Sequence, residues 1–452
     1  MAIVCKFGGT SLANAERINK AYEIVKDNPK RQYVVVSAPG KESKGDTKVT
    51  DLLISCAQGY IIEGTFTNAL KKVEEKFLRI TKELGLEIGE ELCNELEKRI
   101  KSYNEGINKL EYLDLIKSFG ERANAQIVCA YFNKKGLESY LALPEEIGLY
   151  VTSEFGKAYV LDESYENIKS KLSENKSENK GIAVIPGFYG ITKDGKIATF
   201  ARGGSDLTGS IIAASIDAEI YENFTDVDGI FAADPRIIEN PKMISKLTYD
   251  EMRELSYMGT TALQEEAVIP VMKKGIPIHL RNTFAYPKEG TYIVGKKEDS
   301  GVVGIAMKED FISINLRKWL LNREKGVYGK IANIALSEDI SIEHIPSSVD
   351  SLSIIIHSSQ LENNKLEKIV KKISDELKPD RIEVDDNLTL ICVVGEGMKQ
   401  TIGLASRATT ALARAGINIK IINQGASEIN MIYGVRKEDG KNAIEALYRE
   451  FF

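Results

Sequence analysis

The sequence contains little histidine, tryptophan and cysteine. Among 452 residues there are three histidines, one tryptophan and five cysteines. The cysteines show no spacing typical of a metal site or a disulfide framework, so a reducing compartment is expected. They are Cys5, Cys56, Cys93, Cys129 and Cys392. Because the only histidines are His279, His344 and His357, a mechanism that depends on histidine has few candidate residues.

The sequence also has no strong net charge and no long apolar run. Its formal charge is −6, and hydrophobic and charged residues make up 43% and 28% of the chain, as in a soluble globular protein. We therefore expect neither a nucleic-acid partner nor a membrane partner. No apolar stretch approaches the ~18 residues that cross a bilayer, and a strand pattern begins at residue 2 without a signal-like segment. A cytoplasmic location is expected.

The length predicts two or three domains, and the first of them alternates strands with helices. Residues 2–7 and 33–36 are apolar, strand-like runs, and between them Ile18, Tyr22 and Val25 share one face of a helix. A strand, a helix and a strand in this order predict a parallel sheet. Further elements are helices across 66–130, a charged surface loop at 168–181, and strands at 182–188, 197–200 and 218–224. The alternation stops near residue 296.

The remaining residues carry a weak internal repeat. Gly326 and Gly403 each precede a short helical pattern. At the same offset, Ile340 and Ile417 each end a helical pattern and begin a strand. A pattern that recurs at one fixed offset predicts two copies of a βαβ-like unit. The single tryptophan, Trp319, lies in this region and is expected in the core, as is Cys392.

A lysine followed by two glycines and two hydroxyl residues ends the first predicted strand. Ligands of a parallel sheet bind at the carboxyl ends of its strands, and Lys6 lies at such an end. Gly8 and Gly9 allow the backbone to approach a ligand, and exposed backbone amides there favour an anion. Thr10 and Ser11 add hydroxyl donors. The stretch is neither a P-loop nor a GxGxxG motif, and it is compatible both with a phosphate site and with a tight turn beside a solvated lysine.

Two later stretches have the same chemistry. In "RGGSD" (202–206), glycines precede a helix between Arg202 and Asp206, and arginine suits a bidentate grip on a carboxylate. The stretch "TDVDGIFAADPR" (225–236) follows a strand and combines carboxylates, an aromatic side chain and Arg236, as a nucleotide-binding loop does. Taken alone, it is also compatible with an acidic surface loop. Three such stretches at predicted strand ends favour a shared anion-binding site.

These motifs resemble, in order and spacing, those of the aspartate kinase family, and the resemblance covers nearly the whole chain. "KFGGTS" (6–11), "RGGSD" and "TDVDGI" resemble its kinase domain, and "QGASEINM" (424–431) resembles the second of its paired ACT domains. The family implies an α/β amino-acid-kinase fold, an αβα sandwich with a mainly parallel sheet, followed by two ferredoxin-like βαββαβ ACT domains. The corresponding domains are 1–296, 312–380 and 381–452, the last completed by a strand from 300–311.

The resemblance implies ATP-dependent phosphorylation of L-aspartate on its β-carboxylate to 4-phospho-L-aspartate, with ATP and Mg²⁺ as cofactors. This reaction is the first step toward lysine, threonine and methionine. The scarcity of histidine agrees with it, because a carboxylate nucleophile has a free pKa of ~4 and is ionised at pH 7 without a general base. Positioning and charge neutralisation remain, and lysine, arginine, backbone amides and Mg²⁺ can supply both.

The resemblance also implies roles for residues at matching positions. Lys6, Arg202 and Asp206 would be catalytic, with Lys6 on the transferring phosphoryl group and Arg202 on the α-carboxylate of aspartate. Glu121 would hold the α-ammonium group. The residues implied to bind aspartate are Ser37, Thr50, Glu121, Phe188, Arg202, Ser205 and Asp206. The residues implied to bind ATP are Lys6, Gly8, Gly9, Thr225, Asp226, Phe231 and Arg236.

One segment departs from the family pattern. Relatives often carry Gly-Ala-Lys-Val-Leu-His-Pro after the nucleotide loop, whereas this chain reads "GTTALQEEA" from Gly259, with Thr261 at the lysine position. Either Lys273 or Lys274 substitutes for that lysine, or the charge is absent. Three hypotheses are open: an active aspartate kinase, a catalytically weak kinase fold that senses an amino acid, and a kinase acting on glutamate or carbamate. The charged residues of the other motifs remain, which favours the first.

The ACT repeat implies feedback inhibition by an amino acid, with lysine as the first candidate and threonine as the second. ACT domains pair side by side, which implies a homodimer or a dimer of dimers with the effector between paired modules. "KGVYGK" (325–330) and "EHIPSSVD" (343–350) correspond to the effector-binding segments of regulated relatives, although ordinary strand-end polarity is an alternative. The candidate effector residues are Gly326, Val327, Tyr328, Glu343, Ser347, Ser348 and Asp350.

Overall fold

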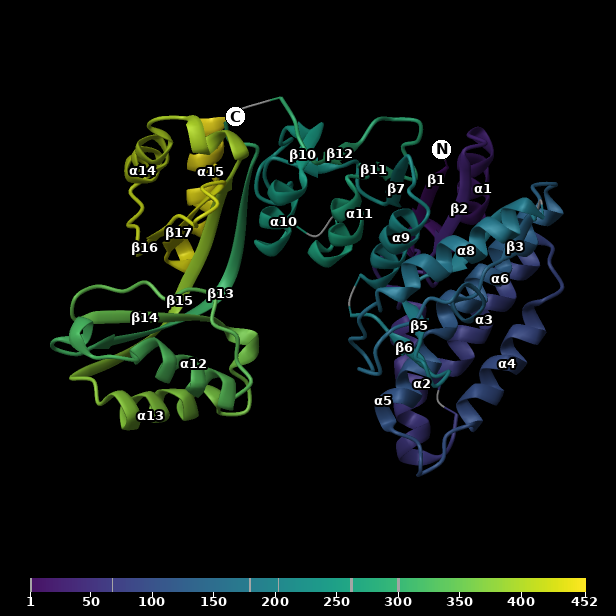
Figure 1. Ribbon diagram of the computed structural model, residues 1–452, viewed down its shortest axis with the longest axis horizontal. Coiled ribbons are helices and arrows are strands. Elements are labelled where there is room, and N and C mark those ends of the chain that lie inside the picture. The colour runs from purple at the N-terminus through teal and green to yellow at the C-terminus, as the bar shows by residue number, and fades with distance from the viewer. Residues whose placement is uncertain (1, 67, 179, 202, 261–262, 299–300) are drawn as a thin grey trace. The chain divides into compact units, whose positions relative to one another are not determined.

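The computed structural model describes residues 2–66, 68–178, 180–201, 203–260, 263–298 and 301–452 (Figure 1). The chain folds into two compact units. The first comprises residues 1–230, 244–253 and 261–297, and the second comprises residues 231–243, 254–260 and 298–452. Each unit has its own sheet and core, so the two are described separately.

The first unit is built on an eight-stranded sheet with the order β10-β12-β11-β7-β1-β2-β4-β3. Every neighbouring pair is parallel except β11 and β12. In that order, the strands are Lys246–Thr248, Thr291–Val294, Ile278–Asn282, Ile220–Thr225, Ile3–Phe7, Arg31–Val36, Ile182–Pro186 and Ser139–Leu141. Phe7 lies opposite both Val36 and Phe224, so the carboxyl ends of the central strands meet at one edge.

Helices cover both faces of this sheet, as the fold prediction requires (Figure 1). Cys5 and Phe7 of β1 point into a core that they share with Tyr22 of α1 and Phe132 of α6. On the opposite face, α9 packs on β1, β2 and β7. The helices of this unit are α1 (Ala15–Asp27), α2 (Val49–Glu63), α3 (Asn68–Leu84), α4 (Gly89–Lys101), α5 (Lys109–Lys117), α6 (Phe119–Lys134), α7 (Pro144–Ile147), α8 (Glu163–Ser177), α9 (Gly204–Ser215) and α11 (Ile269–Lys274).

Short elements lie outside the large sheet. β5 (Tyr189–Ile191) pairs with β6 (Ile197–Thr199), and β8 (Ile230–Phe231) pairs with β9 (Met243–Ile244). The helix α10 (Tyr249–Tyr257) begins with a capping box, in which Thr248 and Glu251 exchange hydrogen bonds of 2.9 and 3.2 Å.

The charged segment 168–181 was wrongly predicted as a loop, because most of it belongs to α8. Ile168 and Leu172, one helical turn apart, are fully buried and anchor this helix. Its charged residues face solvent, where Lys171 pairs with Glu174 at 2.9 Å. In the part of the chain that the structure describes, no helix combines the length and the apolar character of a membrane-crossing segment.

The second unit contains a five-stranded antiparallel sheet with the order β14-β13-β15-β17-β16. Its strands are β13 (Gly304–Arg317), β14 (Ser351–His357), β15 (Arg381–Val394), β16 (Ile421–Asn423) and β17 (Asn430–Val435), and its main helices are α12 (Val327–Ser337), α13 (Lys365–Leu377), α14 (Leu404–Arg414) and α15 (Gly440–Phe451). The long strands β13 and β15 run through two hydrophobic cores. One core contains α12 and α13, and the other contains α14 and α15.

The internal repeat is visible in the helices of this unit. Gly326 and Gly403 precede α12 and α14, which have the same length, and each glycine adopts a left-handed conformation with φ of 80° and 87°. β14 and α13 follow α12, whereas two strands, β16 and β17, follow α14 before α15. Cys392 is fully buried, as expected, but the expectation for Trp319 was wrong. Trp319 is 61% exposed, and its indole lies 4.6 Å from the guanidinium of Arg317.

Candidate active site

A buried lysine and a carboxylate meet at the carboxyl edge of the large sheet. Lys6 of β1 is 6% exposed, and its Nζ lies 2.5 Å from Oδ1 of Asp206 in the first turn of α9. Asn223 of β7 lies between them. Its Nδ2 donates to Asp206 at 2.8 Å, and its Oδ1 lies 3.4 Å from Nζ of Lys6. The carboxamide therefore orients both charged groups.

The "GGSD" part of the second motif places Asp206 at this position. Gly203 adopts φ of 81° just before α9, a left-handed conformation that favours glycine. The Tyr221 hydroxyl donates to the Asp206 carbonyl at 3.0 Å, and a Cβ atom at Gly209 would lie 2.5 Å from the Tyr221 hydroxyl oxygen. The turn and the close packing of α9 on β7 together fix the carboxylate beside Lys6.

The two glycines after β1 allow neighbouring backbone segments to pack closely. The Gly8 N–H donates to the Phe224 carbonyl at 3.0 Å, and the Gly40 N–H donates to the Gly9 carbonyl at 2.8 Å. A Cβ atom at Gly9 would lie 2.8 Å from the Ala38 carbonyl oxygen. Gly9 has φ of −59°, so space rather than a left-handed backbone requires glycine here. The turns after β1 and β2 consequently pack against each other at the sheet edge.

A buried carboxyl group lies beside the second of these turns. Glu121 of α6 is 4% exposed, and its Oε2 has no hydrogen-bond partner. Burial raises the pKa of Glu121 to about 8, opposed in part by hydrogen bonds from the backbone of Ala38 and by the charge of Lys117. The adjoining Asn124 donates to the Ser37 carbonyl at 2.7 Å. An unpartnered buried carboxyl of this kind favours a cationic group of a ligand.

Aromatic and hydroxyl side chains lie near these charged groups. Phe188 follows β4 with φ of 75°, and its amide donates to Thr208 of α9 at 3.0 Å. The Lys117 ammonium lies 5.6 Å from the Phe188 ring centre. A Cβ atom at Gly187 would approach Ser205 of α9 to 2.8 Å. Thr50, half-buried, lies in the first turn of α2.

The first part of the predicted nucleotide loop follows β7 at the same edge. The Thr225 carbonyl accepts a hydrogen bond from the Thr283 amide at 2.9 Å, and Asp226 is exposed. Two residues further on, Asp228 accepts hydrogen bonds from Asn282 at 2.6 Å and Lys288 at 2.8 Å. The segment after β11 thus braces the loop.

The second part of that loop belongs to the second unit. Phe231 is half-buried, whereas the side chain of Arg236 is 83% exposed and pairs with Asp234 at 2.6 Å. The 231–243 segment joins the core formed with α14 and α15, since Ala233 is buried in it. The Ala232 carbonyl accepts a hydrogen bond from the Ile305 amide at 2.7 Å.

The structure thus brings together Lys6, Asp206, Gly8 and Gly9 at one edge. Arg202 and Thr261, both named by the sequence motifs, lie outside the described residues. Lys274, proposed as a substitute for the missing lysine, pairs with Asp217 at 3.2 Å. Asp217 follows the C-terminal end of α9, whereas Asp206 lies in its first turn, so Lys274 is engaged at the opposite end of that helix.

Sequence reasoning missed Asn223 and Lys117. Asn223 is 1% exposed in the middle of β7, beside the buried Glu222. A polar residue at such a position was the available signal, because a buried amide needs a partner. Lys117 gave no comparable signal, since Phe188, whose ring its ammonium faces, is distant in the sequence.

The predicted effector residues lie within the second unit. The Tyr328 hydroxyl donates to Ser347 at 2.8 Å, which joins the start of α12 to the strand-like 343–350 segment. Glu343 is half-buried, and burial raises its pKa. Three of the candidates serve the fold: Gly326 caps α12, Val327 packs in the core and Asp350 accepts from the Leu320 amide at 2.8 Å. Ser348 forms a turn with Ser351.

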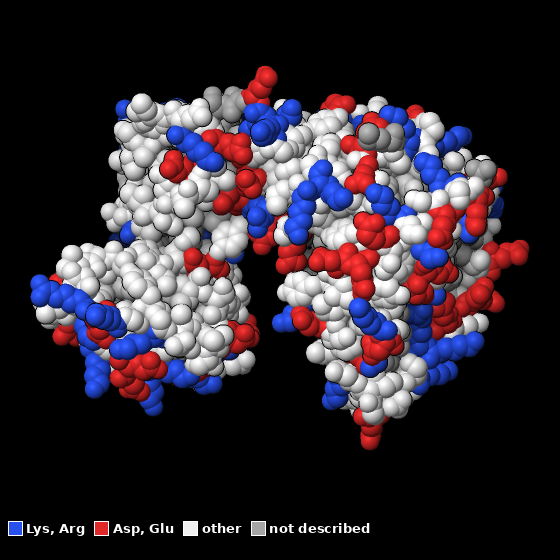
Figure 2. Space-filling view, in the orientation of Figure 1, with Lys and Arg blue, Asp and Glu red and all other residues white. Residues whose placement is uncertain are grey.

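The donor set at the sheet edge contains few carboxylates. Across the described ranges no three histidine, cysteine, aspartate or glutamate side chains group together as a metal cluster would. The five cysteines, all among the described residues, form no disulfide with one another. The visible surface carries basic and acidic side chains in close alternation (Figure 2), in keeping with the near balance of 60 basic and 66 acidic residues.

The fold is that of a known class. Residues 1–282 match the amino acid kinase family, and residues 391–451 match an ACT domain. The chain therefore belongs to the amino acid kinase family, and its second unit carries an ACT domain.

Full-length relatives narrow the class. The chain is 42% identical to aspartokinase 3 of Bacillus subtilis (strain 168) over 453 residues, covering 99% of this chain and 98% of the relative. The crystal structure of Clostridium acetobutylicum aspartate kinase superimposes with a TM-score of 0.88 at 40% identity and full coverage of both chains. This chain is thus an enzyme of the aspartokinase family.

A more distant structure shares the fold. Aspartokinase III of E. coli, solved with aspartate and ADP, superimposes with a TM-score of 0.80 at 22% identity, over 100% of this chain and 99% of the other. The same enzyme was also solved with lysine and aspartate. The predicted succession of an amino-acid-kinase domain and an ACT region is confirmed.

Proposed function

We propose that this chain transfers the γ-phosphoryl group of ATP to the β-carboxylate of L-aspartate at the carboxyl edge of its large sheet. One observation carries the proposal: the Lys6–Asp206 pair lies beside the Gly8–Gly9 turn, and the neighbouring turn lies beside a buried carboxyl, that of Glu121, whose Oε2 has no hydrogen-bond partner. The first group suits a phosphoryl group, and the second suits an ammonium group. An amino acid with a phosphorylatable carboxylate presents both requirements.

Aspartate binds through the two charged groups on its Cα atom. Glu121 holds the α-ammonium group, and Arg202 holds the α-carboxylate. Ser37 and Thr50, on either side of the β2–α2 loop, together with Phe188, Ser205 and Asp206, complete the pocket. Both carboxylates of the substrate are ionised at pH 7, so the β-carboxylate attacks without a general base.

Catalysis rests on neutralising the charge that develops on the transferring group. Lys6 is buried, so its ammonium acts in a medium of low dielectric constant, where it stabilises anionic charge more strongly than in water. Asp206 and Asn223 keep the ammonium in place before ATP arrives. Gly8 and Gly9 lack side chains and so let the phosphates approach the turn after β1, and the loop from Thr225 to Arg236, with Asp226 and Phe231, holds the nucleotide.

The carboxylate content of the edge fits Mg²⁺ that arrives on ATP. Mg²⁺ is commonly held by one or two carboxylates together with substrate phosphates, and Asp206 and Asp226 are the carboxylates of the proposed site. When bound, the ion would neutralise phosphate charge and orient the terminal phosphoryl group.

Regulation is assigned to the second unit. We infer that it contains two ACT domains, 312–380 and 381–452, the second completed by the 300–311 strand, and that they mediate a homodimer or a dimer of dimers. Lysine is the proposed inhibitor, with threonine second, bound near Tyr328, Glu343 and Ser347. The E. coli structure with lysine supports that choice by analogy of fold.

We propose a cytoplasmic location, in keeping with the composition.

The reaction is tested with purified protein, ATP, Mg²⁺ and hydroxylamine, which traps an acyl phosphate as a hydroxamate. We expect hydroxamate with aspartate and none above background with glutamate or carbamate. No product with any of the three would leave the amino-acid sensor as the function. Repeating the assay with lysine and with threonine tests the effector, and sedimentation of the same sample tests the assembly.

A further inference from the structure

One loop connects the two halves of the candidate site. Residues 37–48 lie between β2 and α2. At one end Gly40 donates to the Gly9 carbonyl at 2.8 Å, and the backbone of Ala38 hydrogen-bonds the carboxyl of Glu121. Ser37 begins the loop, and Thr50 follows it in the first turn of α2. The position of this loop therefore determines the position of both binding regions.

The loop has little structure of its own. Its sequence, "SAPGKESKGDTK", is polar and forms neither a helix nor a strand. Lys41, Lys44 and Lys48 are exposed to solvent. A segment of this length without secondary structure is usually either functional or disordered, so its order depends on contacts from the rest of the fold.

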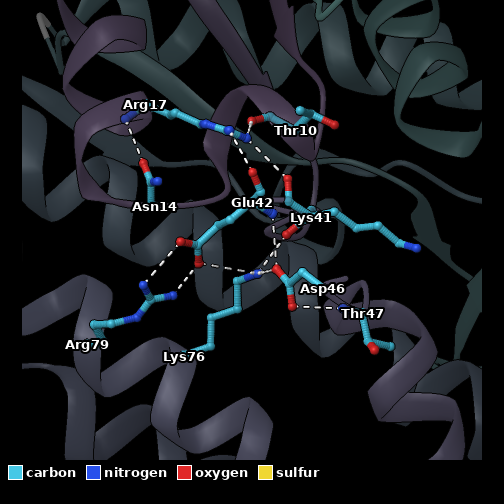
Figure 3. A network of polar contacts seen from close by, with 10 residues as sticks. Thr10, Asn14, Arg17, Lys41, Glu42, Asp46, Thr47, Lys76 and Arg79 are labelled. Atoms are coloured by element: carbon cyan, nitrogen blue, oxygen red, sulfur yellow. Dashed lines mark hydrogen bonds and ion pairs between the residues drawn. The ribbon is translucent and has the colours of Figure 1, made fainter. Parts of the chain in front are cut away.

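Three basic side chains from two neighbouring helices provide those contacts (Figure 3). Arg17 of α1 donates to the carbonyls of Thr10, Lys41 and Glu42 at 2.9, 3.1 and 3.1 Å. Arg79 of α3 pairs with the Glu42 carboxylate. Arg17 thereby links the turn after β1 directly to the loop.

Lys76 of α3 makes the most buried of these contacts. The residue is only 6% exposed, and its Nζ donates to the Gly40 carbonyl at 2.6 Å and to Asp46 at 2.9 Å. Nζ also lies 3.7 Å from the Glu42 carboxylate. Removing a buried ammonium would leave these acceptors without their donor, which is costly. A continuous path thus runs from Lys76 through Gly40 to Gly9.

We propose that Lys76, supported by Arg17, is a positioning residue for the aspartate pocket. It holds the 37–48 loop in the one conformation that brings Ser37, Thr50 and the Ala38 amide to the substrate. Neither side chain contacts the reacting atoms. This inference rests on the proposed function, because it assumes that the pocket beside Glu121 binds aspartate.

The test is Lys76→Met, which keeps most of the length of the side chain and removes its charge and its donors. We expect KM for aspartate to rise about tenfold, as the loss of buried hydrogen bonds predicts. KM for ATP should change much less, because Gly8 stays bonded to Phe224 and the Thr225 loop is braced from β11. Trypsin should cut the folded variant faster after Lys41, Lys44 or Lys48, and aspartate should slow that cleavage.

Lys72→Met, an exposed lysine on the same helix, is the matched control and should match the wild type in both assays. If Lys76→Met does not fold, Arg17→Met tests the inference instead. Arg17 is half-buried, and its substitution should raise KM for aspartate in the same way. An unchanged KM for aspartate and an unchanged tryptic pattern in a folded variant would overturn the inference. Wild-type activity with aspartate is measured separately, so failure of the proposed function would be recognised as such.

Discussion

The buried carboxyl of Glu121 makes aspartate binding depend on pH in a defined direction. Its pKa is raised to about 8 by burial, so at pH 7 only about one molecule in eleven carries the ionised form in the free enzyme. The α-ammonium group of aspartate prefers the ionised form. Substrate binding must therefore expel a proton below pH 8.

The magnitude follows from this equilibrium. We expect KM for aspartate to fall about ninefold between pH 6 and pH 7 and about fivefold between pH 7 and pH 8, because the ionised fraction rises from about 1% to about 9% and then to about 50%. The fall should level off above pH 8. KM for ATP has no such dependence on Glu121 and serves as the internal control.

The assay is a coupled measurement of ADP release at constant ionic strength across pH 6 to 8.5, with ATP saturating. Glu121→Gln, which cannot ionise, should show a high KM for aspartate that does not vary with pH over this range. A flat profile in the wild type, or the same slope in the variant, would refute the assignment of Glu121 to the ammonium group.

The carboxyl of Glu121 also makes the stability of the protein depend on pH. Stability changes with pH in the opposite direction from that expected for a salt-bridged carboxylate. Because the folded pKa lies above the unfolded value of 4.5, the folded protein holds a proton that the unfolded chain releases. The stability of the free enzyme should therefore fall as pH rises from about 4.5 to 8, which Glu121→Gln should not show. Asn223→Leu should lower kcat about tenfold or more with little change in KM, because Lys6 and Asp206 lose their shared partner; equal kcat in variant and wild type would argue against that role. Arg31→Met should lower the free energy of unfolding by about 3 kcal/mol in urea denaturation, because it leaves the buried Glu222 carboxylate with Arg281 alone, and a loss below 1 kcal/mol would contradict this. Glu343→Ala should weaken inhibition by lysine, measured as a shift of the half-inhibitory concentration, and unchanged inhibition would remove Glu343 from the effector site.

The strand ends of the first unit could be predicted because each carries a clear local signal. Lys6, Gly8 and Gly9 follow an apolar run, and in a parallel sheet such ends must share one edge. The register of β1 with β2 and β7 places these ends together. The capping box at Thr248 was predictable for the same reason, since its two residues are neighbours in the sequence.

The sequence-based predictions failed where contacts between distant parts of the chain determine the structure. The α8 segment has few apolar residues, and only its contact with the rest of the unit explains why Ile168 and Leu172 suffice to order it. Trp319 is exposed although it is large and apolar, which composition alone does not reveal. The hydrogen bonds of Arg17 and Lys76 to the 37–48 loop join residues from α1, α3 and the loop, and no local sequence pattern marks their partners.

The central claim is that cationic and amide groups at one sheet edge bring the substrate carboxylate to the terminal phosphate of ATP. It is tested most directly by a crystal structure with aspartate, Mg²⁺ and a non-hydrolysable ATP analogue. We expect Lys6 Nζ within hydrogen-bond distance of the terminal phosphate, and the α-ammonium of aspartate against Glu121 with its β-carboxylate facing that phosphate. Aspartate bound elsewhere, or with its β-carboxylate turned away from Lys6, would contradict the account.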